Sequence, residues 1–186
     1  DSDPMTSWFQ DMAKRQDLIM LSHWEYGFRN MTNNVRPINV PADVEGLKMR
    51  VPPEIQLSAC VESLGGLVTQ IAFPELYLAL SQGVVDGQEN PIAVIYFNKL
   101  YEVQKHLALT KHIYNNMIHV VSARSWGRLT PEQQDIFREE SRASGQLMRS
   151  EIAKAEADQV EKLAGLGMLV TKHDLAPFKA KAQSAH

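Results

Sequence analysis

Cysteine, long apolar runs and an excess of basic charge are all missing from this sequence. Cys60 is the single cysteine, which excludes an intrachain disulfide framework. No apolar run approaches the roughly 18 residues that a membrane-spanning helix needs. The formal net charge is −3 and the lysines and arginines are scattered, which argues against a nucleic-acid partner. The remaining composition is that of a soluble globular protein of one domain or two small lobes.

Signatures of catalysis and of cofactor binding are also missing. There is no Gly-x-Ser-x-Gly motif, and Cys60 lies in an amphipathic stretch with no histidine nearby, as a small core residue would. The six histidines form neither a His-Glu-x-x-His pair nor a tight cluster, which argues against a metal. The glycine pairs lack the rest of a dinucleotide fingerprint. We therefore expect no cofactor.

The chain begins at Asp1, without an initiating methionine or a signal-peptide pattern. We expect either a mature form or a fragment, and the compartment cannot be read from a targeting segment.

Short strand patterns alternate with helical ones along most of the chain. The spacing predicts helices at 1–16 (with a cap-like Asp3-Pro4), 54–64, 74–82, 91–100, 131–163 and 175–185. It predicts strands at 17–24, 27–32, 47–51, 67–72, 106–110, 113–122 and 168–171, and a turn at 126–129. A βα alternation implies a parallel sheet with helices on both faces, and such sheets place ligands at the carboxyl ends of their strands.

The helical pattern after Thr130 is unusually long. Thr130 serves as the cap and Pro131 as the first helical residue. From Pro131 to Leu163 the helix would span about 50 Å at 1.5 Å per residue, which exceeds one small domain. Its apolar stripe is sparse and its surface is charged, so it either lies across two lobes or packs on a partner.

The stretch Gly83–Pro91 combines turn-forming glycines, the acids Asp86 and Glu89, and Asn90 at the N-cap position before Pro91. A helix start of this kind can offer N–H groups to an anion, although an ordinary capped loop has the same composition. The acids could serve as a general acid and base, although carboxylates at a turn are more often capping or solvated.

Recognition chemistry fits the remaining polar residues better. Arg50 projects near the end of an alternating strand, where its guanidinium can grip a carboxylate, or where it can pair with an acid such as Glu75. Phe73 follows the next strand and can floor a pocket or join the core. Arg29, Arg50, Phe73 and Asn90 all fall at segment ends that a parallel sheet could bring together. They predict a carboxylate pocket with an aromatic wall and no nucleophile, which favours binding over catalysis.

Four motifs in this order resemble the motif series of substrate-binding proteins of TRAP (tripartite ATP-independent periplasmic) transporters, and matching continues over nearly the whole chain. They are Gly46–Pro52 (GLKMRVP), Ala72–Leu80 (AFPELYLAL), Gly83–Pro91 (GVVDGQENP) and Lys99–Lys105 (KLYEVQK). The resemblance implies that Arg50 clasps the ligand carboxylate, that Asn90 and Phe73 complete the pocket, and that Arg29 is a second, more variable ligand arginine. Further pocket residues would be Trp24, Tyr26, Glu89 and Tyr114.

The resemblance also implies the fold class: an α/β, type II periplasmic-binding-protein fold of two lobes with parallel-rich sheets and a long helix spanning both. Family members are considerably longer, and the N-terminal part of the first lobe has no counterpart here. We expect residues 29–120 to form mainly the second lobe, and residues 1–28 and 121–186 to form the remainder of the first lobe and the long helix.

The function implied is a periplasmic, non-enzymatic protein that delivers an organic acid or sugar acid to an ion-driven TRAP permease. Two alternatives stay open. One is a carboxylate-processing hydrolase or lyase that uses Asp86 and Glu89, and the other is an interaction module built on the long helix.

Overall fold

A computed structural model describes residues 4–183 and contains two compact units. Unit 1 holds the described residues up to Tyr26 together with Asn116–Lys154, and unit 2 holds Gly27–Asn115 together with the described residues from Ala155 onward. The units differ from the predicted lobes at the C-terminal end, because the residues after Lys154 belong with 27–115. The predicted cap at Asp3 lies outside the described residues. Assignment of the units to the two lobes of a binding protein stays a prediction.

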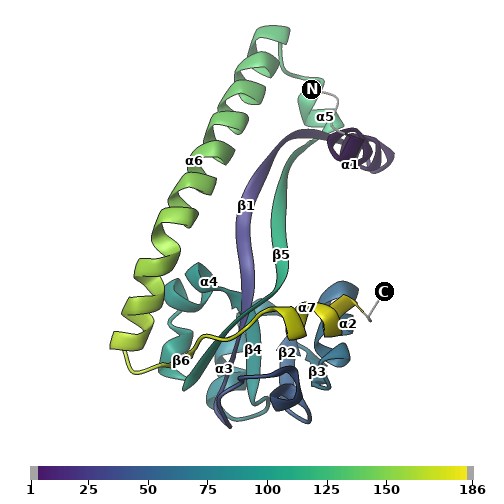
Figure 1. Cartoon of the computed structure of the whole chain (residues 1–186). Helices are drawn as coiled ribbons and strands as arrows, with labels where there is room; N and C mark the ends of the chain where they lie inside the picture. The colour runs from purple at the N-terminus through teal and green to yellow at the C-terminus, as the bar shows by residue number, and fades with distance from the viewer. Residues whose placement is uncertain (1–3, 184–186) are drawn as a thin grey trace. The chain divides into compact units, whose positions relative to one another are not determined.

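The sheet has six strands in the order β3-β2-β4-β1-β5-β6 (Figure 1). These are β1 (Leu18–Asn33), β2 (Lys48–Val51), β3 (Leu67–Gln70), β4 (Gly87–Pro91), β5 (His106–Ser122) and β6 (Leu169–Thr171). Strand β2 runs parallel to β3 and β4, β5 runs parallel to β6, and β4 is antiparallel to β1. The α/β class and the parallel-rich sheet are therefore confirmed.

Two apolar cores cover the sheet of unit 2. The α2/α7 core packs under helices α2 (Ile55–Ser63) and α7 (Ala176–Gln183) and the 3₁₀ helix η1 (Pro41–Val44). The α3/α4 core packs under α3 (Leu76–Ser81), α4 (Ile92–Phe97) and the 3₁₀ helix η3 (Leu100–Glu102). The 3₁₀ helix η2 (Phe73–Glu75) directly precedes α3 and has no buried residue. Ala108 belongs to the first core and Leu107 to the second. Since successive side chains of a strand point to opposite faces, the cores lie on opposite faces of the sheet.

The predicted strand pairs 17–24 with 27–32, and 106–110 with 113–122, are wrong as pairs, because each is one continuous strand, β1 and β5. Each strand contains a residue with positive φ in or directly after the predicted gap: Gly27 (φ 104°) follows the gap in β1, and Lys111 (φ 43°) lies in the gap in β5. The breaks in the apolar pattern therefore mark local backbone irregularities within long strands.

The prediction for Gly83–Pro91 is wrong in one respect. Residues 87–91 form strand β4, α4 begins only at Ile92, and its N-cap is Pro91, with no side-chain cap. Asn90 is therefore a strand residue. The physical reason is that β4 pairs with β2 on one side and β1 on the other, so tertiary pairing outweighs the turn-forming composition.

Unit 1 contains α1 (Pro4–Arg15), the short helix α5 (Ala123–Trp126) and the first part of α6 (Pro131–Gly165). The last residue of α5, Trp126, is the first residue of the turn predicted at 126–129. The predicted cap is confirmed, because Gln133 N–H donates to Thr130 Oγ1 (3.3 Å) and Thr130 N–H donates to Gln133 Oε1 (2.9 Å). The 35-residue α6 contributes to both units, with its last part in unit 2. Within residues 4–183, no helix combines the length and the apolarity needed to cross a membrane.

Candidate functional site

A buried ion pair lies where β1 and β4 meet in unit 2. Arg29 is 4% exposed and its guanidinium binds the Glu89 carboxylate with both Nε and Nη2, the latter 2.7 Å from Oε1. The same Nη2 also donates to the backbone carbonyl of Glu89 (2.8 Å). The antiparallel pairing of β1 with β4 brings Arg29 and Glu89 close together, since Met31 lies opposite Glu89 and Arg29 lies opposite Pro91 in the register. A forked arginine–carboxylate contact of this kind fixes both side chains.

The ionised form of Glu89 is favoured although the side chain is buried. Burial raises the pKa of its carboxyl, but hydrogen bonds from His112 and Arg29, together with the charge of Arg29, outweigh burial and hold the pKa below its ordinary value. Arg29 and Glu89 therefore form a charged pair inside the protein.

Asn90 is held in the same network. Its Oδ1 accepts a hydrogen bond from Arg29 Nη2 (3.2 Å) and its Nδ2 donates to Gln88 Oε1 (2.5 Å). Gln88 donates in turn to Thr32 Oγ1 (2.9 Å), whose hydroxyl donates to Gln104 Oε1 (2.8 Å). All of these side chains are buried. The carboxamide of Asn90 is therefore oriented by neighbours on β1 and β4.

The sequence reasoning named none of Thr32, Gln88 and Gln104 as a site residue, and it also missed two polar partners of the Arg29–Glu89 pair on β5. His112 on β5 places Nε2 3.3 Å from Glu89 Oε2 and Nδ1 2.7 Å from Thr110 Oγ1, and its side chain has no exposed surface. Asn115 accepts from Arg29 Nη1 at 3.4 Å. The available signal was the polar interruption Thr110-Lys111-His112 between two apolar runs, which was interpreted as a strand boundary.

Arg50 and Phe73 meet at the carboxyl end of β2. Arg50 is 1% exposed, and its Nε donates to the carbonyl of Ile71 (2.8 Å). Its guanidinium carbon lies 5.9 Å from the centre of the Phe73 ring, which is within the range of a cation–π contact. Phe73 itself is 43% exposed in η2, so its ring is neither a core residue nor fully open. Arg50 pairs with Gln88 in the β2–β4 register, two residues before Asn90.

The other predicted pocket residues have separate surroundings. Trp24 and Tyr26 belong to unit 1, where Trp24 Nε1 donates to Ser22 Oγ (3.0 Å). Tyr114 belongs to unit 2, is 49% exposed and packs its ring 5.1 Å from that of Phe28. Their role as pocket residues stays a prediction.

Asp86 and Glu89 bind different partners. Asp86 Oδ2 accepts a hydrogen bond from the backbone N–H of Lys48 (2.8 Å) at the amino end of β2, which ties the loop before β4 to β2. Glu89 lies three residues further along β4, or about 10 Å at 3.3 Å per strand residue, and is committed to Arg29 and His112. This separation weighs against a paired general acid and base.

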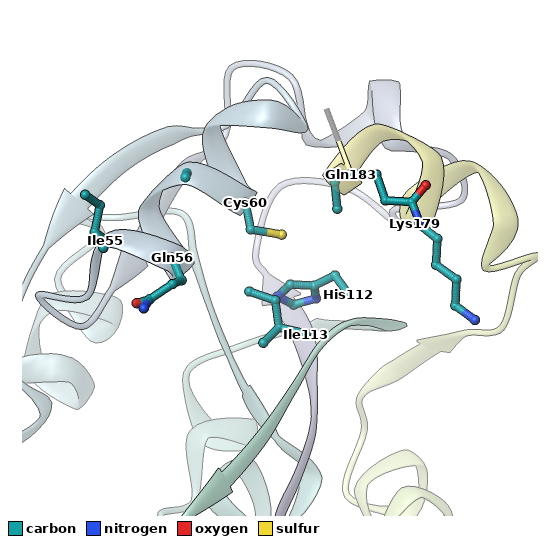
Figure 2. A pocket seen from close by; sticks show the side chains of 9 residues that line it. Ile55, Gln56, Cys60, His112, Ile113, Lys179 and Gln183 are labelled. Atoms are coloured by element: carbon teal, nitrogen blue, oxygen red, sulfur yellow. The ribbon is translucent and has the colours of Figure 1, made fainter. Parts of the chain in front are cut away.

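A pocket of about 570 Å³ opens beside the network, between α2, β5 and α7 (Figure 2). It is lined by Ile55, Gln56, Ala59, Cys60, His112, Ile113, Lys179, Ala182 and Gln183. Burial, and to a lesser degree the charge of Glu89, raises the pKa of the Cys60 thiol to about 11, which makes it a poor nucleophile. The pocket shares His112 with the network but is not lined by Arg50, Phe73 or Asn90. We place the candidate site at the arginines, because a carboxylate needs a fixed positive charge.

Metal ligands do not gather here, since the part of the chain that the structure describes contains no group of three His, Cys, Asp or Glu side chains suited to a metal ion.

Known proteins match this chain over its length. The family model of bacterial extracellular solute-binding proteins, family 7, matches residues 1–186. The sialic acid-binding periplasmic protein SiaP of Vibrio cholerae is 36% identical over 93% of this chain and 54% of its own length. Among solved structures, a TRAP periplasmic solute-binding protein from Polaromonas bound to D-erythronate is 36% identical with a TM-score of 0.94, covering 99% of this chain and 61% of that one.

A TRAP periplasmic solute-binding protein from Sulfitobacter with bound β-D-galacturonate is 30% identical with a TM-score of 0.92, covering 100% of this chain and 61% of that one. The chain thus spans little more than half the length of these relatives. The match over all residues confirms the resemblance found in the motifs, and the chain belongs to family 7 of the bacterial extracellular solute-binding proteins.

Proposed function

We propose that this chain forms part of a periplasmic solute-binding protein that captures a small carboxylate, an organic acid or a sugar acid, and delivers it to a TRAP-type membrane permease without transforming it. The observation that carries the proposal is Arg50, a guanidinium 1% exposed at the carboxyl end of a parallel strand and stacked near Phe73. Carboxyl ends of parallel strands are where such sheets bind ligands. A buried guanidinium in that position selects an anion of planar, forked geometry.

The four predicted contacts have separable roles in this proposal. Arg50 binds the carboxylate, Phe73 covers one face of the guanidinium, and Asn90 donates or accepts at a ligand hydroxyl. Arg29 orients Asn90 through a 3.2 Å hydrogen bond and brings its own charge already balanced by Glu89. The balance limits the cost of keeping a second guanidinium buried when the site is empty.

The ligands named for similar proteins support this ligand class. Proteins similar to this chain hold D-erythronate and β-D-galacturonate, and another is named for sialic acid. These molecules share one carboxylate and several hydroxyls, which suits a site of one anion-binding arginine and amide side chains.

A thermal-shift screen against C4 aldonates, uronates, sialic acid and simple dicarboxylates tests the proposal. A ligand at 100 times its Kd stabilises a folded binder by about 2.7 kcal/mol. The acid that stabilises most is then titrated by calorimetry. Arg50→Ala is expected to weaken its binding by about 2–5 kcal/mol.

Lys48→Ala is the matched control, because it removes an exposed positive charge from the same strand. Binding of this variant should stay within a factor of about two of the parent, as expected for a screened surface charge. A panel in which no acid stabilises the protein, or an Arg50→Ala variant that binds as tightly as the parent, would refute the proposal.

A further inference from the structure

Strand β5 changes phase between its two ends. Leu107 and the neighbouring Leu109 pack on the α3/α4 core, whereas Ala108 packs on the α2/α7 core. Ile113 packs on the α2/α7 core as well, although it is an odd number of residues from Ala108. A regular strand would send these two side chains to opposite faces. One extra residue must therefore lie between Leu109 and Ile113.

The irregularity is at Lys111, whose φ of 43° is in the left-handed region. Such a conformation is uncommon for a residue other than glycine and marks a bulge when it occurs inside a strand. One consequence is visible in Figure 2, where the consecutive residues His112 and Ile113 both line the pocket beside α2. A bulge redirects side chains in this way.

Asn30 ties the bulge to the neighbouring strand. It is fully buried on β1, and its Oδ1 accepts a hydrogen bond from the backbone N–H of Lys111 at 3.3 Å. Its Nδ2 donates to the carbonyl of Phe28 at 3.0 Å, which fixes the amide orientation. The side chain of Lys111 points to other partners, Glu156 at 2.8 Å and the Phe28 ring. The backbone and the side chain of Lys111 thus make different contacts.

We propose that the left-handed backbone of Lys111, held by Asn30, positions the His112 imidazole against Glu89 and thereby sets the Arg29–Glu89 pair. Lys111 and Asn30 are then positioning residues that touch no ligand. The part of the inference that concerns ligand affinity rests on the proposed function, whereas the part that concerns His112 does not.

Lys111→Gly and Lys111→Val form a matched pair of variants. Both remove the ammonium and its contact with Glu156. Glycine adopts φ near +43° without strain, whereas a β-branched residue is strongly disfavoured there. The readouts are the imidazole ¹⁵N NMR signals of His112, assigned by comparison with His112→Gln, and the Kd of the carboxylate selected by the thermal-shift screen.

Lys111→Gly should keep the parental His112 signals and a Kd within about twofold of the parent, since it preserves the backbone conformation. Lys111→Val should shift the His112 signals and weaken binding by about tenfold, the size of effect that backbone strain of this kind produces. If Lys111→Val does not fold, Lys111→Ala takes its place, and it should change the His112 signals and the Kd in the same direction by a smaller amount.

Identical His112 signals in the glycine variant and in the folded strained variant would overturn the inference. If no variant binds a carboxylate, and the parent does not either, the result counts against the proposed function. The comparison of the His112 signals then decides the inference about Lys111. Asn30→Ala gives an independent check, because it removes the acceptor of the Lys111 N–H and should shift the His112 signals without altering any charge.

Discussion

The two buried arginines of unit 2 are held in different ways. Arg29 binds the Glu89 carboxylate through Nε and Nη2 and also donates to Asn90 and Asn115. Arg50 donates its Nε to a backbone carbonyl and lies against the ring of Phe73. Arg29 thus belongs to a network whose charges balance within the protein. Arg50 lies beside the half-exposed ring of Phe73, where the proposed ligand anion would contact the guanidinium.

This difference indicates that the two arginines have different roles, one in stability and one in ligand binding. A buried charge pair is costly to break, because removing one partner leaves the other charge without compensation. The proposed ligand role of Arg50 is instead tested by measuring affinity. We therefore expect substitutions around Arg29 to act mainly on stability and substitutions around Arg50 to act mainly on binding.

Glu89→Ala should have the largest effect on stability. It leaves the Arg29 guanidinium buried without its carboxylate, and the free energy of unfolding should fall by about 3–5 kcal/mol. Urea unfolding followed by circular dichroism measures the change. Glu75→Ala, which removes an exposed carboxylate of unit 2, should change stability by less than about 0.5 kcal/mol. Equal effects of the two variants would contradict the separation drawn between the arginines.

Acid should remove the contribution of the same pair. The pKa of Glu89 is lower in the folded protein than its ordinary value of 4.5, so its stabilisation is complete above that value and is lost as the pH falls through the depressed folded pKa. Glu89→Gln cannot titrate at this position. The stability difference between the parent and Glu89→Gln should therefore be largest near pH 7 and should shrink below about pH 4.5. A difference that stays constant from pH 7 to pH 3 would show that folding does not lower the pKa of Glu89.

Local sequence signals predicted the elements whose structure is decided locally. Strand β2 followed from the alternation of Met49 and Val51 with polar residues, and the start of α6 followed from the Thr130–Gln133 capping box. Arg50 and Phe73 could be placed together because each lies at the carboxyl end of a predicted strand, and the carboxyl ends of parallel strands lie at one edge of a sheet.

The Arg29–Glu89–His112 network could not be predicted in this way. It depends on β4 lying beside β1 and on β5 lying on the other side of β1, which no local pattern states. Asn90 was assigned to a helix cap because Asn-Pro favours one, but pairing with two neighbouring strands decided its conformation. The bulge at Lys111 was interpreted as a strand end, since a change of phase looks the same in sequence whether the strand stops or continues.

The smallest predicted effect concerns the aromatic neighbour of Arg50. Phe73→Ala removes the ring that lies 5.9 Å from the guanidinium carbon and should weaken carboxylate binding by about 1 kcal/mol, a typical value for a partly exposed cation–π contact. Phe73→Leu retains apolar bulk without the ring and should recover less than half of this loss, if the electrostatic face of the ring is what matters. Phe97→Ala, at a phenylalanine that is 72% exposed, serves as the calorimetric control and should leave the Kd unchanged. Because Phe73 is itself 43% exposed, its removal should lower the free energy of unfolding only slightly. A Phe73→Ala variant that binds the carboxylate normally but unfolds much more easily would contradict this expectation. The ring would then be a structural element, as Arg29 is, and not part of the ligand site with Arg50.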